Sequence, residues 1–169
     1  MSIHEMLRWK VNDGDLVSLI PRRPGAAPKR SMLLTQDLWE LLNSPQGDDE
    51  IDDRMGALKA DLEVFADGQP LHPKYLFLLS PVRDAVWEIR SVRPKPSIRV
   101  LGLFAARDTF VATNWALRGP LGHFDAAKWR AAKRRALAVW RHLFGGCEPI
   151  RETDPKTFTT GAIDGKYFK

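Results

Sequence analysis

The sequence predicts an α+β fold, in which helices pack on a small, mainly antiparallel, twisted sheet. Residues 86–117 contain three runs rich in β-branched and aromatic residues, joined by two short connections, and such runs favour an antiparallel meander. One amphipathic helix pattern precedes these runs, and a second follows them at residues 125–144. Strands grouped between helices favour an antiparallel sheet with helices on it. We therefore expect N-terminal helices and a C-terminal helix on one sheet, with an extension at each end of the chain.

Residues 1–34 are predicted to form an N-terminal strand and a loop. The segment VNDGDLVSLI, residues 11–20, has a turn sequence followed by strand-forming residues, and Pro21 ends it. The next ten residues, PRRPGAAPKR, disfavour both a helix and a central strand, which indicates a mobile loop. Residues 35–145 are the predicted core domain. The tail, residues 146–169, has no clear periodicity and is predicted to be either a segment on the surface or disordered.

Two helices are expected before the main strands. Thr35 can cap a short helix that runs through Leu42, and the sequence NSP ends it. Asp48 or Asp49 caps a longer helix, which has an acidic first turn and ends before Gly68. Five apolar residues of this helix form a single stripe that should pack on the sheet. They are Ile51, Met55, Leu58, Leu62 and Phe65.

Four strands and a final helix follow. After the loop GQPLHP, the apolar run KYLFLL at residues 74–79 fits a buried strand. The runs VWEIRSV, SIRVLGLF and TFVATNWAL are separated only by PKP and ARD, so we expect three consecutive strands. Asp125 is a suitable cap for a helix that continues to Phe144 and ends at Gly145. The apolar face of this helix holds Trp129, Ala132, Ala136, Trp140 and Leu143, and a separate basic face holds Arg130, Arg134 and Arg141.

The composition indicates a soluble globular protein that needs no metal or disulfide to fold. With 169 residues, of which 44% are hydrophobic and 28% charged, the chain can bury a core unaided. Its single cysteine, Cys147, has no intramolecular disulfide partner, and its four histidines have no metal-ligand spacing. No apolar run approaches the ~18 residues that span a bilayer, and the first ten residues do not resemble a signal peptide. We therefore expect no metal, no cofactor, no membrane association and a cytoplasmic location.

The positive charge is concentrated in one segment. Residues 81–145 hold 13 of the 26 basic residues and 4 of the 21 acidic residues, a net charge of +9, whereas residues 1–80 carry a net charge of −4. A basic segment of this kind is expected where a protein binds a polyanion, because each neutralised phosphate releases counterions. The alternative is a basic surface that only faces solvent.

Arginines within the predicted strands are the main candidates for a functional site. Side chains two residues apart on a strand share a face. Arg90 therefore lies on the same face as Glu88, and Trp87 lies on the other face. If the first two strands of the meander are neighbours, Arg90 and Arg99 converge on one surface, with Arg118 at its rim. Such a cluster of guanidinium groups would fit a phosphate. The alternative is that Arg90 or Arg99 only pairs with a carboxylate such as Glu88.

Other candidate residues follow the third strand or lie in the connections and the last helix. His123 can act as an acid or base near neutral pH, although an exposed or capping histidine is the simpler alternative. Lys128 is a second candidate proton carrier. Trp115 is close to Arg118 in the sequence and could stack on a base, whereas the other strand and helix tryptophans fit core positions. The predicted contacts to a nucleic acid are Arg93, Lys95, Trp115, Lys128, Arg130 and Arg134.

Residues 51–150 resemble the RelE/HigB superfamily of bacterial toxins. The similarity lies in the order of an apolar helix, a DGQPLHPKYLFL segment, VWEIR, IRVLGLF, a third strand that runs to an arginine, and a basic helix. The sequence AAKRRALAVWRHLFGGCEPI resembles the last helix of the HigB branch, which has phage-encoded relatives. The resemblance covers about 100 of the 169 residues and implies a RelE-like fold.

The resemblance implies an endoribonuclease toxin that cuts messenger RNA in the ribosomal decoding site without a metal. In that family basic side chains hold the scissile phosphate, the ribose 2′-hydroxyl attacks it, and a side chain protonates the leaving oxygen. Arg90 matches the arginine that closes the family's tryptophan-glutamate strand motif, and Arg99 matches the one that opens the next strand. Relatives commonly have two lysines after the third strand, where this chain has ALRGP with Arg118. The implied partner is a protein antitoxin, with a helix-turn-helix fold like that of HigA.

Two other functions fit the same scaffold. A ParE-like inhibitor of DNA gyrase would dock its basic helix on a protein and break no bond, so messenger RNA would stay whole. A phage-derived binding protein would keep the fold and lack the activity. The missing lysine pair slightly favours this last alternative.

Overall fold

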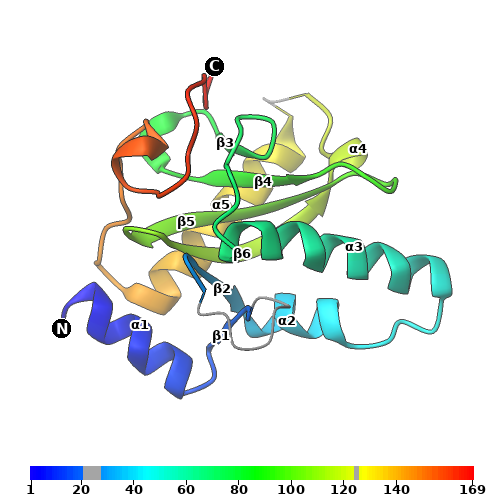
Figure 1. The fold of residues 1–169 in the computed structure, drawn as a ribbon, viewed down its shortest axis with the longest axis horizontal. Helices are drawn as coiled ribbons and strands as arrows, with labels where there is room; N and C mark the ends of the chain where they lie inside the picture. The colour runs from blue at the N-terminus through cyan, green and yellow to red at the C-terminus, as the bar shows by residue number, and fades with distance from the viewer. Residues whose placement is uncertain (21–27, 124–125) are drawn as a thin grey trace.

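The computed structural model of the chain describes residues 1–20, 28–123 and 126–169 (Figure 1). Their helices are α1 (Ile3–Asn12), α2 (Gln36–Asn43), α3 (Asp49–Ala66), α4 (Arg118–Leu121) and α5 (Ala127–Phe144). Their strands are β1 (Leu16–Ser18), β2 (Ser31–Thr35), β3 (Leu76–Leu78), β4 (Trp87–Ser91), β5 (Ile98–Ala106) and β6 (Thr109–Leu117). None of these helices has both the length and the apolar composition needed to cross a membrane.

Within the described residues the strands form one open sheet in the order β1-β2-β6-β5-β4-β3. Neighbouring strands are antiparallel except β2 and β6, which run parallel. The meander expected within residues 86–117 is formed by β4, β5 and β6, and the run at residues 74–79 contains β3. The prediction of an α+β fold with a mainly antiparallel sheet is confirmed.

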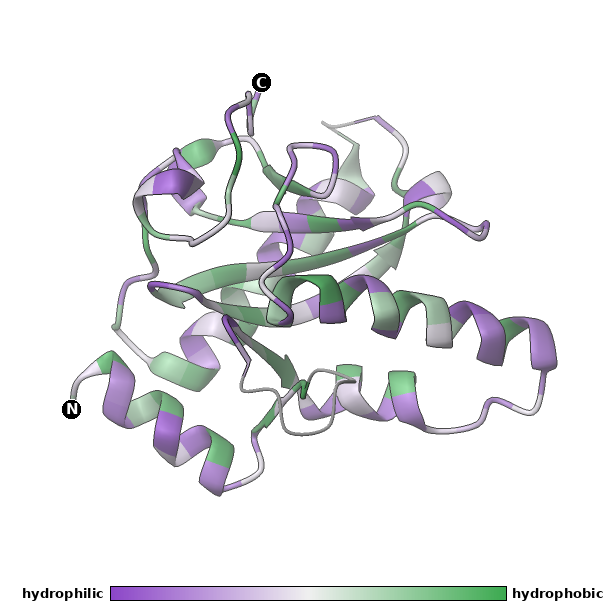
Figure 2. Ribbon diagram, in the orientation of Figure 1, coloured by the Kyte–Doolittle hydropathy of each residue, from purple (hydrophilic) through white to green (hydrophobic). Residues whose placement is uncertain are grey.

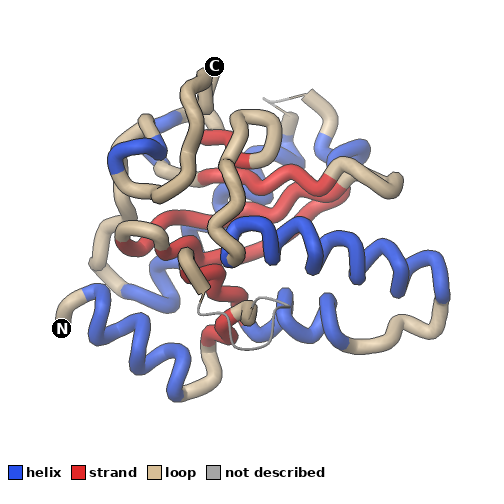
Figure 3. Tube along the Cα trace, in the orientation of Figure 1, coloured by secondary structure: helices blue, strands red, loops and turns tan. Residues whose placement is uncertain are grey.

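Helices cover both faces of the sheet, and hydrophobic residues concentrate along the strands between them (Figure 2 and Figure 3). The face covered by α2, α3 and the C-terminal tail is called the α3 face, and there Phe65 of α3 packs against Phe104 of β5. The face covered by α1 and α5 is called the α5 face, and there Trp129 and Trp140 of α5 belong to one buried cluster with Leu101 of β5. The sheet therefore has an apolar core on each side.

The long helix α3 has the predicted boundaries and most of the predicted packing. Asp48 caps it by accepting hydrogen bonds from the backbone N–H groups of Glu50 and Ile51. Gly68 follows its end with a φ of +76°, a conformation that favours glycine. Four residues of the predicted stripe are buried, namely Met55, Leu58, Leu62 and Phe65. Ile51 is instead 46% exposed, because the first turn of α3 lies beyond the sheet (Figure 1).

The N-terminal region differs from its prediction. The helix α1 is not among the predicted elements, although Ser2 and Glu5 form a capping box at its start. The strand predicted within residues 11–20 is reduced to β1. The strand β2 is also not predicted, because its SMLLT sequence is short and follows a proline-rich segment, yet it is buried between β1 and β6. The expected domain boundary between residues 34 and 35 therefore falls inside a strand of the sheet.

Two predictions fall on residues outside those described. They are the mobile loop, as far as it covers residues 21–27, and the Asp125 cap. Among the described residues, α5 ends at Phe144, as predicted, and begins after Ala126, one residue later than the predicted cap. The short helix α2 begins after Thr35, as predicted, but the Thr35 side chain makes no capping hydrogen bond.

The C-terminal tail is ordered and packs on the α3 face. The ring of Phe158 lies 4.8 Å from that of Phe104, between centroids. The Tyr167 hydroxyl donates to the carbonyl of Leu71 at 2.6 Å, and the Tyr167 carbonyl accepts from the N–H of Leu78 at 2.7 Å, along the outer edge of β3. Of the two alternatives for the tail, the surface segment is the one observed, and its aromatic side chains join the core.

Arg30 joins the tail to the rest of the fold. It is 1% exposed, and burial lowers the pKa of its guanidinium from the usual value. The guanidinium donates to four backbone carbonyls. They belong to Val64 and Phe65 in the last turn of α3, to Gln69, and to Thr160 in the tail, at 3.2, 2.6, 2.7 and 2.5 Å. One buried cation thus holds together three segments that are far apart in the sequence.

Candidate nucleic-acid interface

The strands β4 and β5 place two arginines side by side on the α5 face. In their antiparallel register Arg90 lies directly opposite Arg99, and Glu88 lies opposite Leu101. Cross-strand partners share a face of the sheet, and Leu101 belongs to the core beneath α5. Both arginines therefore point to that side. The predicted convergence of Arg90 and Arg99 on one surface is confirmed.

Both guanidinium groups meet one carboxylate. Arg90 donates from Nε to Glu88 Oε1 at 2.6 Å, and Nε of Arg99 lies 3.5 Å from Glu88 Oε2. The Glu88 side chain is 1% exposed, whereas those of Arg90 and Arg99 are 23% and 12% exposed. Pairing with Glu88, the alternative to a phosphate site, is therefore present. The single negative charge of Glu88, however, neutralises only one of the two guanidinium charges, so the pair keeps an excess of positive charge.

Arg90 contacts an aromatic ring, and the charges around Arg99 change its pKa. The ring of Phe77, on β3, lies with its centroid 4.2 Å from Cζ of Arg90, a cation–π geometry. Burial lowers the pKa of Arg99, and the positive charges of Arg90 and Arg118 lower it further, whereas Glu88 raises it. A guanidinium stays protonated at neutral pH despite such shifts. An anion that entered would therefore relieve repulsion between partly desolvated cations.

Arg118, the first residue of α4, directly follows β6 and is the third arginine beside Arg90 and Arg99. Its Nη1 donates to the carbonyl of Gly122 at 2.9 Å, and its Cζ lies 5.7 Å from the ring centroid of Trp129. Trp129 Nε1 donates to the same carbonyl at 3.3 Å. Gly122 has a φ of +71°, which favours glycine and lets the chain fold back after α4. Arg90, Arg99 and Arg118 are called the arginine cluster from here on.

The hairpin between the two arginine-bearing strands is fixed from the α3 face. Arg54 of α3 is 4% exposed and donates to the carbonyl of Pro96 at 2.8 Å. It also donates to the carbonyl and the hydroxyl of Ser91, at 3.1 and 2.9 Å, and that hydroxyl donates to Asp61 Oδ2 at 2.5 Å. Ser91 ends β4 and Pro96 precedes β5, so these bonds fix the strand ends that carry Arg90 and Arg99.

Five of the predicted RNA contacts are exposed basic residues. Two lie in the hairpin between β4 and β5, and three lie in the first half of α5. They are Arg93, Lys95, Lys128, Arg130 and Arg134. Because the hairpin continues directly from β4 and the first turn of α5 contains Trp129, which lies against Arg118, these charges extend the positive field beside the arginine cluster.

Trp115 lies away from the arginine cluster, whereas His123 directly follows Gly122, whose carbonyl accepts from Arg118. Trp115 lies opposite Val100, which belongs to the core on the α3 face, whereas Ala116 lies opposite Arg99. Strand alternation therefore points Trp115 away from the cluster, and the expectation that it stacks a base there is corrected. His123 is exposed after α4, and its side chain makes no hydrogen bond or ion pair with another described residue.

Three residues that shape the site are not predicted in that role. Phe77 lies in KYLFLL, an apolar run in which polar and apolar residues do not alternate. The pattern therefore does not predict on which face of the sheet Phe77 lies. Trp129 is expected only as a core residue. Arg54 lies three residues after Ile51 and four before Leu58, so helical spacing places it beside the apolar stripe, and this is the one signal of its burial.

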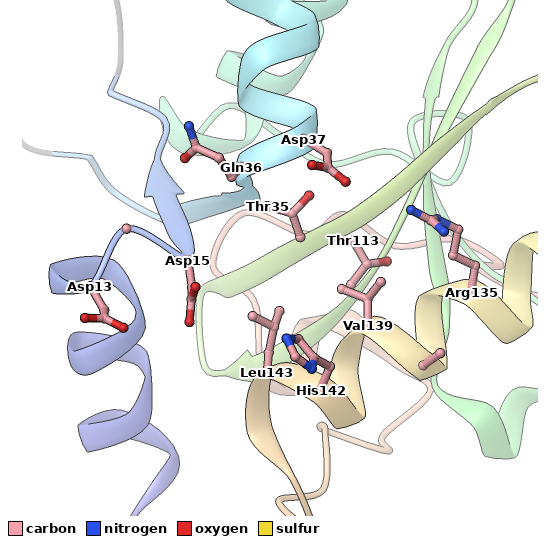
Figure 4. A pocket seen from close by; sticks show the side chains of 12 residues that line it. Asp13, Asp15, Thr35, Gln36, Asp37, Thr113, Arg135, Val139, His142 and Leu143 are labelled. Atoms are coloured by element: carbon pink, nitrogen blue, oxygen red, sulfur yellow. The ribbon is translucent and has the colours of Figure 1, made fainter.

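A separate pocket lies between α1, α2 and α5 (Figure 4). Its volume is about 530 Å³, and Asp13 and Asp37 line it together with Arg135 and His142. In Figure 4 the carboxylates come from the turn after α1 and the start of α2, and the basic side chains come from α5. This mixture of charges does not suit a polyanion. Across residues 1–20, 28–123 and 126–169, no group of three or more His, Cys, Asp or Glu side chains is arranged to hold a metal ion.

Comparison with known proteins adds no family assignment. No protein-family model matches the chain, and neither a curated protein nor a solved structure matches it significantly. The resemblance to RelE/HigB toxins stays a prediction, and the arginine cluster is the structural feature from which function can be argued.

Proposed function

We propose that the chain is a toxin of the RelE/HigB type, an endoribonuclease that cuts messenger RNA on the ribosome without a metal. The arginine cluster is the observation that supports this most: three guanidinium groups from β4, β5 and the first residue of α4, with the carboxylate of Glu88 between two of them. Guanidinium groups fit phosphate oxygens with two parallel N–H···O bonds. The net charge of +9 on residues 81–145 would also favour the approach of RNA.

The arginines would stabilise the charge that develops on the phosphate. In the proposed reaction the ribose 2′-oxygen attacks phosphorus and the bond to the 5′-oxygen breaks, which gives a 2′,3′-cyclic phosphate and a 5′-hydroxyl. Arginines that bind the transition state more tightly than the substrate accelerate this step. One proton must leave the 2′-hydroxyl, and one must reach the 5′-oxygen. His123 and Lys128, both exposed, are the proposed proton carriers.

The proposal includes two partners. Messenger RNA bound to the ribosome is the proposed substrate. A protein antitoxin, with a helix-turn-helix fold like that of HigA, is the proposed inhibitor, because an unneutralised nuclease would kill its host. An acidic segment of that antitoxin would complement the exposed basic residues of the β4–β5 hairpin and of α5.

A second candidate function is RNA binding without cleavage. The observation that favours it is the position of Glu88, which accepts from Nε of Arg90 and lies 3.5 Å from Nε of Arg99. A carboxylate in this position weakens the attraction for a phosphate but leaves other guanidinium N–H groups for binding. Such a protein would keep the basic surface of the toxin and lack its activity.

Expression of the wild-type chain in a bacterial host distinguishes these functions. A ribosome-dependent nuclease should arrest growth and produce new RNA 5′ ends inside translated regions, and the purified protein should cut messages on ribosomes but not free RNA. Normal growth and intact transcripts, together with RNA binding by the purified protein, would support the second candidate and contradict the nuclease. Arrested growth with intact transcripts and inhibited gyrase supercoiling would support the gyrase alternative instead.

A further inference from the structure

Glu88 is a buried carboxylate whose two oxygens are unequally bonded. Its Oε1 accepts a hydrogen bond from Arg90 Nε at 2.6 Å. Its Oε2 lies 3.5 Å from Arg99 Nε, and neither of these two atoms has a hydrogen-bond partner among the described residues. Incomplete pairing of a buried charge is unfavourable. Buried charged atoms without a hydrogen-bond partner are found mainly at functional sites. Glu88 therefore differs from an ordinary surface ion pair.

Glu88 meets both arginines through Nε and leaves most of their N–H groups for a ligand. A guanidinium carries five N–H groups. Within the described part of the chain, the Arg90 side chain makes no hydrogen bond besides the one from Nε, and the Arg99 side chain donates only from Nη1, to the carbonyl of Ile98 at 3.2 Å. Both arginine side chains are partly exposed, at 23% and 12%, so solvent and ligands can reach them.

We propose that Glu88 is a positioning residue for RNA cleavage, an inference that rests on the function proposed above. Its carboxylate accepts the hydrogen bond from Arg90 Nε and attracts Arg99 Nε across 3.5 Å, so that the remaining N–H groups of both arginines converge on one phosphodiester. The same carboxylate repels the phosphate that the arginines attract. Glu88 therefore weakens the binding of RNA and raises the rate at which bound RNA is cut.

The two effects have separate physical origins. Arginine side chains are long and flexible, and a fixed anchor at Nε aims their donors at the phosphate before the reaction begins, which lowers the barrier of the chemical step. The repulsion between the carboxylate and the phosphate acts on the bound substrate as well, and it is strengthened in a partly desolvated site. A residue that only stabilised the fold would not affect binding and rate in opposite directions.

Glu88→Gln tests the proposal, because it removes the charge and keeps the size of the side chain. A non-cleavable RNA with a 2′-deoxy scissile nucleotide should bind the variant about three- to tenfold more tightly than the wild type, at one fixed salt concentration. Single-turnover cleavage of ribosome-bound messenger RNA should fall at least about tenfold. Glu152→Gln is the matched control, because Glu152 is an exposed carboxylate in the tail, and it should change neither value.

Glu88→Asp keeps the proposal testable if glutamine is not tolerated in the buried position. The shorter side chain keeps the negative charge but withdraws the carboxylate from Arg90. RNA affinity should then stay as in the wild type, while cleavage slows. Unchanged cleavage in either folded variant, or weaker RNA binding by Glu88→Gln, would overturn the positioning role.

The arginine Nε–H signals in proton–nitrogen correlation spectra separate this proposal from the nuclease function. Arg90 Nε–H should be shifted and protected from solvent exchange in the wild type, and Glu88→Gln should reduce both effects, because a neutral amide oxygen is a weaker acceptor than a carboxylate oxygen. If the wild type cuts no RNA but these spectral changes and the tighter binding are observed, the nuclease function is wrong and the orientation of the arginines by Glu88 stands. If the wild type cuts RNA and Glu88→Gln cuts it equally fast, the positioning role is wrong and the nuclease function stands.

Discussion

Replacing Arg30 by methionine is expected to lower the free energy of unfolding by about 3–5 kcal/mol. Arg30 is 1% exposed, and it donates to four carbonyls, those of Val64, Phe65, Gln69 and Thr160. Methionine fills most of the same volume but donates no hydrogen bond, so four buried or partly buried carbonyls each lose a hydrogen bond. A hydrogen bond to a charged group contributes about 1.5–3 kcal/mol, and the loss of several is partly offset because a cation no longer has to be desolvated.

Urea unfolding followed by circular dichroism measures the change. Arg83→Met is the matched control, because the Arg83 side chain is 85% exposed, and it should change the free energy of unfolding by less than about 0.5 kcal/mol. The amide of Leu78, which donates to the carbonyl of Tyr167, should also lose protection from hydrogen exchange in Arg30→Met. A loss of stability below about 1 kcal/mol with an unchanged Leu78 amide would show that Arg30 does not hold the tail.

Arg99→Ala is expected to reduce cleavage of ribosome-bound messenger RNA by about 10²–10³-fold while the chain stays folded. Arg99 lies opposite Arg90 in the sheet, and the charge of Arg118 acts on its pKa. Removing one preorganised donor from a developing negative charge raises the barrier by about 2.7–4 kcal/mol in comparable sites. Stability should change little, because a partly desolvated cation beside two others is removed and Glu88 keeps its hydrogen bond from Arg90.

Two further variants show whether the effect belongs to the position and the shape of the side chain. Arg99→Lys keeps the charge but loses the planar donor group, so cleavage should fall between that of the wild type and that of Arg99→Ala. Arg141→Ala removes an exposed arginine from the last turn of α5 and should leave cleavage unchanged. If folded Arg99→Ala cuts RNA as fast as the wild type at the same protein concentration, Arg99 does not bind the scissile phosphate.

The meander and the long helices could be predicted because local patterns determine them. The PKP and ARD connections are short enough to require hairpins, and the acidic first turn and apolar stripe of α3 mark a helix. The strand β2 and the ordered tail could not be predicted in this way. Their places depend on partners far along the chain, namely β6 for β2 and the carbonyl of Leu71 for Tyr167. No local periodicity carries that information.

Strand geometry predicts the face of the sheet on which each residue of the candidate site lies. Alternation and register place Arg90 and Arg99 on one face of the sheet, and the same alternation places Trp115 on the other face. The prediction for Trp115 was wrong because it used the closeness of Trp115 to Arg118 in the sequence instead of strand alternation. The role of Glu88 could be stated only as an alternative. Which arginine nitrogen meets which carboxylate oxygen depends on side-chain rotamers, which the sequence pattern does not specify.

A double-mutant cycle on RNA affinity tests most directly whether Arg90 and Arg99 bind the same phosphodiester. The wild type, Arg90→Ala, Arg99→Ala and the double variant are compared for binding of the non-cleavable RNA at one fixed salt concentration. The cycle is then repeated with Glu88→Gln in all four proteins, which removes any coupling that passes through the shared carboxylate.

Two guanidinium groups on one phosphodiester predict a coupling energy of about 1 kcal/mol or more in both sets of proteins, because neither arginine alone can form the full set of hydrogen bonds. Single losses that add to the double loss within about 0.5 kcal/mol, or a coupling that disappears with Glu88→Gln, would contradict a shared phosphodiester.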